Sequence, residues 1–327
     1  MAHTANRAPR ADLRFGETWT RSQRLKNDAI WGLASLALGA MRRIPKAWRG
    51  ALGGVVGALV HATARGERHR ALANVARALP HLDLPARRAL VRRCFRTLGE
   101  LLGETVGVLG GSDPIELLPL ASEASATLDR ARGEGRGVVF ASAHLGPWER
   151  VAASIAATGV PFTVLTRDSY DPRFSRTQNT MRRRARIKVI RRSSEGPVSA
   201  TLGVLRALRR GDVVGIAMDL KTRVASCDVP FLGTPAPTAL GPARIALRTG
   251  APVVVGSAVP AAQSDGRAAD EQLEVTATRI ATHDLVDSPA GARELTMRIN
   301  AELSRRILAM PHAWVWMHAR WGIEGEL

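Results

Sequence analysis

The sequence predicts an α/β fold: a mostly parallel central sheet flanked by helices, preceded by an N-terminal helical region. From residue 119 onward, short apolar runs alternate with segments whose apolar residues recur at helical spacing, and strands separated by helices pair in parallel. Before residue 119, helical spacing dominates, with Arg at the positions between the apolar residues. With 327 residues and 45% hydrophobic content, the chain is long enough to bury a sizeable core.

We divide the chain into three parts. Residues 1–24 are polar and rich in Arg, which predicts a flexible basic tail. Residues 25–118 are expected to form the N-terminal helical region, and residues 119–327 the α/β core. The helices expected in the N-terminal region are Ala29–Met41, Ala47–Ala64 and Leu84–Leu109.

The α/β core is expected to alternate between strands and helices. The expected strands are Gly137–Ala143, Pro161–Thr166, Ile187–Ile190, Asp212–Met218, Pro252–Val259 and Leu273–Ile280. The expected helices are Leu145–Thr158, Pro172–Ala185, Val198–Arg209, Ala239–Arg248 and Ala290–Ala309. Such an alternation predicts a sheet that is covered by helices on both faces.

The charge of the chain is strongly positive and unevenly distributed. The formal net charge is +18, and residues 1–100 contain 19 Lys and Arg against 6 Asp and Glu. A second basic run, Arg173–Arg192, contains no acidic residue. A surplus of this size favours an anionic partner: a nucleic acid, an anionic membrane surface or an acidic protein. Aromatic residues make up only 4% and no nucleic-acid-binding motif occurs, which argues against nucleic acid.

The N-terminal helical region is expected to face a membrane surface. Its longest apolar window, Ala29–Met41, is too short for a membrane span and lacks the features of a signal peptide. Basic amphipathic helices that carry Trp31 and Trp48 are typical of proteins that lie at the membrane surface, peripherally or shallowly inserted. An ordinary helical subdomain with Arg on its solvated face is the alternative.

Neither cysteine nor histidine spacing indicates a metal site. Cys94 and Cys227 are far apart in the sequence, which argues against a disulfide framework and favours a reducing cytoplasm. No His-Glu-x-x-His pair occurs among the eight histidines. We expect no metal and no bound cofactor.

One expected strand end contains the strongest candidate for chemistry. The strand is followed by His144, and the next helix is expected to be capped by Gly146 with Pro147 as its first residue. His144 then lies at a carboxyl strand end, where ligands bind in open α/β sheets, and Glu149 lies in the first helical turn. A histidine beside a carboxylate is a general base with an orienting partner, although Glu149 also fits a helix-terminal acid.

Other candidate site residues are expected at the same edge of the sheet. Asp219 follows an apolar strand and is placed to orient His144 or to bind a polar acceptor, although strand-end Asp is also a common turn former. Arg167 follows another strand, and Arg182 and Arg183 lie on the next helix. Arg side chains are preferred for phosphate, so these three are candidates for binding a phosphate-bearing group. Arg runs are also typical of solvated helix faces.

Two further segments stand out toward the C-terminal end. The Pro-rich segment Val229–Thr238 is expected to be a loop, either the wall of an acyl pocket or a rigid crossover. The segment Trp314–Trp321 is dense in aromatic residues, and we expect its Trp side chains to pack in the core.

Taken in order, these motifs resemble the late lipid A biosynthesis (lauroyl/myristoyl) acyltransferase family, within the lysophospholipid acyltransferase superfamily. The resemblance covers roughly residues 30–322, and five weak motifs in the right order make it specific. The motifs are His144-x4-Glu149, Arg167 with Asp171-Pro172, Ala217-Met218-Asp219, Val229–Ala236 and Trp316–Trp321. Two N-terminal segments, Leu72–Pro80 and Gly99–Glu104, are similar as well.

The resemblance implies a membrane-bound enzyme on the cytoplasmic face of the bacterial inner membrane. Such an enzyme transfers a fatty acyl group from an acyl thioester to a hydroxyl of a glycolipid, such as a lipid A precursor. The resemblance implies that His144 acts as the base and that Glu149 supports it, and Asp219 is a second candidate to hold the imidazole. The acyl donor is expected to be a thioester of acyl carrier protein or of coenzyme A, and no cofactor is needed.

Two alternatives stay open at the level of sequence. One is an acyltransferase of the same fold with a phospholipid, an amine or a natural product as its acceptor. The other is a non-catalytic basic protein of the membrane surface.

Overall fold

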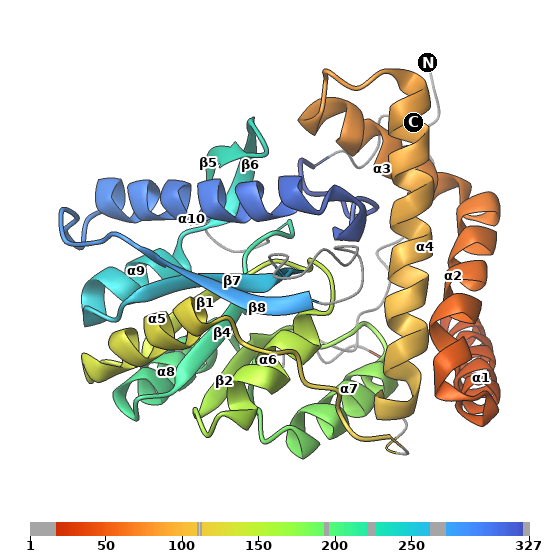
Figure 1. The fold of residues 1–327 in the computed structure, drawn as a ribbon, viewed down its shortest axis with the longest axis horizontal. Helices are drawn as coiled ribbons and strands as arrows, with labels where there is room; N and C mark the ends of the chain where they lie inside the picture. Colours follow the sequence, from red (N-terminus) through yellow and green to blue (C-terminus); the bar gives the residue numbers. More distant parts are fainter. Residues whose placement is uncertain are drawn as a thin grey trace.

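The computed structural model describes residues 18–109, 111, 113–192, 196–221, 226–261 and 273–322. These residues form a mixed α/β core, with a group of N-terminal helices standing against one side of it (Figure 1). The predicted fold class of a mostly parallel sheet flanked by helices is confirmed.

The central sheet has six strands in the order β3-β2-β4-β1-β7-β8. Neighbouring strands are parallel except for β8, which runs antiparallel to β7. All six strands were expected from the sequence, and their bounds differ from the expected ones by at most a residue or two. The strands are β1 (Val138–Ser142), β2 (Phe162–Thr166), β3 (Lys188–Arg191), β4 (Val213–Ala217), β7 (Val253–Pro260) and β8 (Leu273–Ile280).

Helices cover both faces of this sheet. Alternate residues of a strand point to opposite faces, so Val138 and Phe140 pack in one layer while Val139 and Ala141 pack in the other. The layer with Phe140 contains α5 (Ser122–Gly133) and α6 (Trp148–Ala157); the opposite layer contains α8 (Gly196–Arg209), α9 (Gly241–Thr249) and α10 (Pro289–Ala309). Burial on both faces explains why the sequences of the central strands β1, β4 and β7 are almost continuously apolar.

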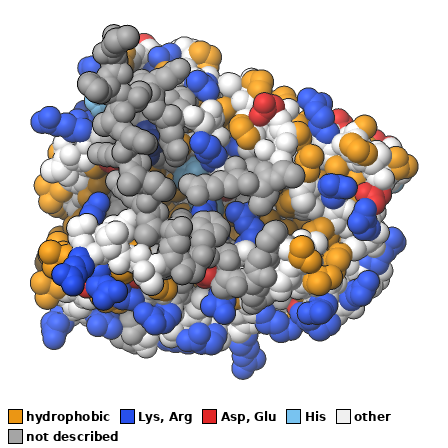
Figure 2. Space-filling view, turned by 180° about the vertical axis from the view of Figure 1, so that it is seen from behind, with side chains coloured by type: hydrophobic (Ala, Val, Ile, Leu, Met, Phe, Trp, Pro, Cys, Tyr) orange, Lys and Arg blue, Asp and Glu red, His pale blue; other side chains and the backbone are white. Residues whose placement is uncertain are grey.

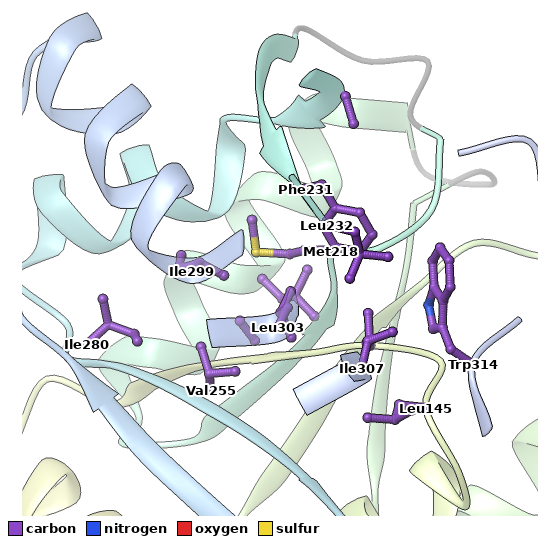
Figure 3. Packing of buried hydrophobic residues seen from close by; sticks show 14 of the residues in the cluster. Leu145, Met218, Phe231, Leu232, Val255, Ile280, Ile299, Leu303, Ile307 and Trp314 are labelled. Carbon is purple, nitrogen blue, oxygen red and sulfur yellow. The ribbon is translucent and has the colours of Figure 1, made fainter. Parts of the chain in front are cut away.

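The packing of α10 shows how the second layer is filled. Leu303 and Ile307 of α10 gather with Val255 of β7 and with Met218, directly after β4 (Figure 3). All four side chains are at most 5% exposed. Each such side chain contributes about 1.5–3 kcal/mol through burial, so α10 is firmly held on the sheet.

The described residues of the N-terminal region, from residue 18 onward, form four helices: α1 (Arg21–Arg43), α2 (Lys46–Thr63), α3 (Arg65–Ala78) and α4 (Leu84–Leu109). Glycines allow the backbones of α2 and α4 to touch. A Cβ atom on Gly53 would overlap the carbonyl oxygen of Gly99, and one on Gly57 would overlap the carbonyl oxygen of Phe95. The spacing of small residues four positions apart, Gly53 with Gly57 and Gly99 with Gly103, is typical of closely packed helix pairs in membranes.

The outer faces of α1 and α2 leave many apolar side chains in contact with solvent. Leu33 is 69% exposed, and Leu36 and Trp48 are each 71% exposed. Figure 2 shows hydrophobic side chains next to Lys and Arg at the lower left of the view, and Lys and Arg along its lower edge. Within the described ranges, no helix combines the length and the apolarity that crossing a bilayer requires.

The structure corrects several expected boundaries. Residues 1–17 of the expected tail lie outside the described residues, but α1 already begins at Arg21, where Thr20 and Gln23 form a capping box. Helix α6 begins at Trp148 with Pro147 as its N-cap, so Gly146 is not the cap but a residue with φ +56° in the preceding turn. Helices α3 and α5 were not predicted.

The Pro-rich segment is a hairpin and not a loop. Strands β5 (Ser226–Phe231) and β6 (Thr234–Ala239) pair antiparallel, with Pro230 opposite Pro235 and Asp228 opposite Pro237. Proline has no N–H to donate, yet a two-stranded ribbon tolerates it because each strand has a free edge.

Candidate active site

The adjacent ends of β1 and β4 place His144 beside Asp219. Ser142 and Ala217 are register partners at the carboxyl ends of these parallel strands, so the residues that follow meet at one edge of the sheet. Nδ1 of His144 lies 2.9 Å from Oδ1 of Asp219, and the backbone N–H of His144 donates to Oδ2 at 2.8 Å. One carboxylate therefore fixes both the backbone and the ring of the histidine.

Asp219 is fully buried and is held by a third residue. The indole Nε1–H of Trp314 donates to its Oδ2 at 2.8 Å. Burial on its own would raise the pKa of Asp219, but the adjacent His144 and these hydrogen bonds hold that pKa below its usual value. The carboxylate is thus ionised at neutral pH and acts only as an acceptor.

The ionised carboxylate determines the state of the imidazole. Because Asp219 only accepts, Nδ1 of His144 must carry the hydrogen, which leaves Nε2 as a proton acceptor. Burial opposes protonation of the ring, yet Asp219 and, more weakly, Glu149 raise the pKa of His144 above its ordinary value. The side chain is 27% exposed, so the ring remains accessible from a cavity. This arrangement supports general-base chemistry.

Glu149 lies in the first turn of a helix, as expected, but its partner is not the imidazole. It lies on the second residue of α6 and pairs with Arg182 of α7 (Pro172–Arg184) through two hydrogen bonds, one of them from Nε to Oε2 at 3.1 Å. The direct partner of the imidazole is therefore Asp219, and Glu149 influences His144 through its charge. Arg182 is only 8% exposed, and its guanidinium is already engaged by Glu149.

The three arginines expected to bind phosphate do not come together in the structure. Arg167 follows β2 and lines the same cavity as His144, as does Arg182. Arg183 is exposed, donates to the hydroxyl of Thr180 at 2.8 Å and is not among the cavity-lining residues. The three arginines therefore do not form one cluster.

A cavity of about 550 Å³ lies over the carboxyl ends of the parallel strands. One apolar wall comes from α6 and the sheet, including Phe140, Ala152 and Phe162. Two glycines leave room for these rings. A Cβ atom on Gly215 would overlap the ring of Phe162, and one on Gly256 would overlap the ring of Phe140. The opposite wall comes from α8 and α9. The cavity thus joins an apolar interior to the imidazole of His144.

Several residues of this site were not predicted. Trp314 packs in the core as expected and is fully buried, but its indole N–H also holds Asp219. His318 lines the cavity, and burial lowers its pKa. The side-chain amide of Asn74 on α3 donates to the carbonyl oxygens of Trp316 and His318 and so fixes the C-terminal segment. Trp314 and Asn74 lie in sequence segments that stood out, but spacing alone did not indicate their partners.

The described residues contain no group of three His, Cys, Asp or Glu side chains that is arranged to hold a metal ion. Cys94 is buried on α4, whereas Cys227 lies in the β5–β6 hairpin. The absence of a metal or bound cofactor from the reaction stays a prediction.

Comparisons with known proteins identify the family of this chain. A search of curated proteins finds no match to this chain. The family model described as bacterial lipid A biosynthesis acyltransferase matches residues 20–322. That match covers nearly the whole chain, including all four N-terminal helices, His144, Asp219 and the C-terminal aromatic segment. The chain therefore belongs to the bacterial lipid A biosynthesis acyltransferase family, and the protein is an acyltransferase enzyme.

Proposed function

We propose that this enzyme transfers a fatty acyl group from an acyl thioester to a hydroxyl group of a glycolipid, such as a lipid A precursor, with His144 as the general base. The observation that carries the proposal is the contact of the buried Asp219 with His144, which lines a cavity with apolar walls. Such a cavity suits a fatty acyl chain, and the imidazole lies where the chain would meet a hydroxyl.

The proposed reaction uses the free nitrogen of the imidazole. Nε2 of His144 takes the proton of the acceptor hydroxyl, and the oxygen attacks the thioester carbonyl carbon. A C–O bond forms, the C–S bond breaks, and the imidazolium returns its proton to the leaving thiolate. Asp219 stabilises the imidazolium formed in between, as the carboxylate does in a catalytic triad.

The developing negative charge on the carbonyl oxygen needs hydrogen-bond donors. Helix α6 begins four residues after His144, and the backbone N–H groups of its first turn carry partial positive charge. The N–H groups of Trp148, Arg150 and Val151 already donate to the carbonyl oxygens of Gly146 and Pro147. We therefore assign the oxyanion to this helix end through its partial positive charge and not through those three N–H groups. Glu149 holds Arg182 beside it, so the pair contributes a fixed dipole and no net charge.

The proposed location is the cytoplasmic face of the bacterial inner membrane, with peripheral or shallow association. The support comes from α1 and α2, which carry both exposed apolar side chains, such as Leu33, Leu36 and Trp48, and exposed Lys and Arg. Apolar side chains of such helices insert into the interface while basic ones contact anionic lipid. A lipid acceptor would then reach the site without leaving the bilayer surface.

The proposed donor is a thioester of an acyl carrier protein or of coenzyme A. The net charge of +18 supports recruitment of an acidic carrier protein, because complementary charge raises the association rate. On α7, Arg183 is exposed and suited to such docking, whereas Arg184 is committed to the carbonyl oxygens of Val108 and Asp113. Arg183→Glu should therefore raise the KM for the carrier-protein donor, and only in low salt.

Acyl transfer by purified protein tests the proposal directly. We expect product by lipid mass spectrometry when the full chain, an acyl thioester and a glycolipid acceptor are combined. His144→Ala should lower kcat/KM by about 10²–10⁴-fold, the usual contribution of a general base. His81→Ala is the matched control, because His81 is exposed and outside the cavity. A folded His144→Ala enzyme with normal turnover would refute the role of the histidine.

A further inference from the structure

Arg192 is a charged residue of the cavity that the proposed reaction does not use. It directly follows β3, and its backbone N–H donates to the carbonyl oxygen of Thr166 at 2.9 Å. This bond fixes Arg192 beside the end of β2 and next to Arg167. Both arginines line the cavity that contains His144.

The charge of the cavity lining is strongly unbalanced. The described lining residues include one carboxylate, that of Glu149, which Arg182 already neutralises. The cationic side chains of the lining are Arg167, Arg182, Arg192, Lys221 and Arg244. A cavity walled in this way attracts an anionic ligand.

Within the described part of the chain, the guanidinium of Arg192 has no hydrogen-bond or ion-pair partner. The side chain is half-buried, and burial lowers its pKa without a described carboxylate to offset the effect. Arginine nevertheless stays charged in proteins, so a desolvated cation faces the cavity. Such a group is costly unless it is paired, and an anionic ligand would supply the missing partner.

The position of Arg192 separates its ligand from the reacting atoms. Strands β4 and β2 lie between β1, which carries His144, and β3, which carries Arg192. Three strand spacings amount to about 14 Å. The backbone of Arg192 therefore lies well away from that of His144, and an anion held beside β3 would act as an anchor and not in the bond changes.

We propose that Arg192 binds a phosphate group of a substrate at the far end of the catalytic cavity and so positions that substrate for transfer. The fork of a guanidinium matches the oxygens of a phosphate in a bidentate manner. The inference rests on the proposed acyl transfer, which offers two sources of phosphate. One is the phosphopantetheine arm shared by carrier-protein and coenzyme A donors, and the other is the head group of the glycolipid acceptor.

Binding measurements with two matched pairs of probes test this site. The first pair is 4′-phosphopantetheine and pantetheine; the second is a phosphorylated disaccharide glycolipid and its dephosphorylated form. Calorimetric titration of the full chain should show about 10- to 100-fold tighter binding of the phosphorylated member of one pair. Arg192→Ala should abolish that preference. Arg191→Ala should retain it, because Arg191 is exposed and lies outside the cavity lining.

The pair that shows the preference identifies the source of the phosphate. Lack of preference in both pairs, or a preference that survives in Arg192→Ala, would overturn the proposal. Thermal unfolding checks the fold of each variant, and Arg192→Gln replaces Arg192→Ala if the latter does not fold. The probes need no turnover, so a wild-type protein that fails to transfer acyl groups would count against the proposed function and leave the binding result decisive for Arg192.

Discussion

The α/β core and the N-terminal helices differ in how far their apolar side chains are buried. In the core, Val139 of β1, Val214 of β4 and Val255 of β7 are fully buried. On α1 and α2, Leu33 and Trp48 remain about 70% exposed. The core therefore buries its apolar surface within the chain, whereas the outer faces of α1 and α2 leave theirs available to a partner outside the chain. Large exposed apolar patches commonly mark such interaction surfaces.

Polar groups follow the same division between the two regions. Asp219 and Arg182 in the core are buried and each has a specific partner. Arg96 on α4 pairs with Glu100 on the same helix, but its side chain is 67% exposed. Buried pairs fix geometry and are costly to break, whereas exposed pairs contribute little. Changes in the core should thus affect acyl transfer and folding stability. Changes on the exposed faces of α1 and α2 should affect the association of the protein with a partner surface.

The largest expected effect concerns Asp219. Asp219→Asn keeps the shape of the side chain but removes the charge that holds Nδ1–H of His144, so we expect kcat to fall by about 10²–10⁴-fold. The carboxylate raises the pKa of His144, and a protonated ring cannot act as a base. Any residual activity of the variant should therefore persist to lower pH than in the wild type.

A pH–rate profile measures this shift. Asp228→Asn, an exposed change in the β5–β6 hairpin, is the control and should leave the profile unchanged. An acid limb that stays in place in Asp219→Asn would show that the carboxylate does not set the pKa of His144.

The next effect concerns the pair of Glu149 and Arg182. Removing one partner leaves the other charge poorly solvated, so Glu149→Gln and Arg182→Gln should each lower the free energy of unfolding by about 3 kcal/mol. The double variant should lose less than the sum of the two. Denaturant unfolding measures these differences.

The exposed pair of Arg96 and Glu100 is the matched control. Glu100→Gln should change the free energy of unfolding by less than about 0.5 kcal/mol, because both charges remain hydrated. Equal losses in Glu149→Gln and Glu100→Gln would remove the distinction between the two regions.

A smaller effect is expected where α2 meets α4. Gly53→Ala places a methyl group against the carbonyl oxygen of Gly99 and should cost about 1–3 kcal/mol through separation of the helices. Gly39→Ala on α1 meets nothing within 4 Å and should stabilise its helix by about 0.5–1 kcal/mol. Thermal unfolding distinguishes them, and similar shifts of the same sign would contradict the close approach of α2 and α4.

The smallest expected effect concerns the exposed apolar face. Leu33→Ala should weaken binding to anionic vesicles by about 1 kcal/mol, because part of the side chain leaves the interface. Vesicle flotation measures the change, and added salt should weaken binding further. Val286→Ala is the control, since Val286 is 72% exposed but lies between β8 and α10, away from the N-terminal helices in the sequence. Equal effects of both variants would show that α1 has no special role.

Much of the core could be predicted from local sequence patterns. The strands β1, β4 and β7 are largely apolar runs, β8 alternates between apolar and polar residues, and helix α4 coincides with its expected bounds. Helix α3 was missed because its sequence is rich in Arg and only Ala71 and Val75 among its apolar residues are fully buried. The hairpin was missed because proline disfavours strands in general. A strand with a free edge nevertheless tolerates proline, and both strands of this hairpin have one.

The sequence by itself determined the alternation of strands and helices and the place of His144 at a carboxyl strand end, because both follow from short-range periodicity and turn residues. Tertiary structure decided the partners. The strand order places β4 next to β1, so Asp219, 75 residues away in sequence, reaches the imidazole. Glu149 of α6 likewise contacts Arg182 of α7, 33 residues away in sequence. Spacing along a chain cannot specify such contacts, because they depend on which strands become neighbours.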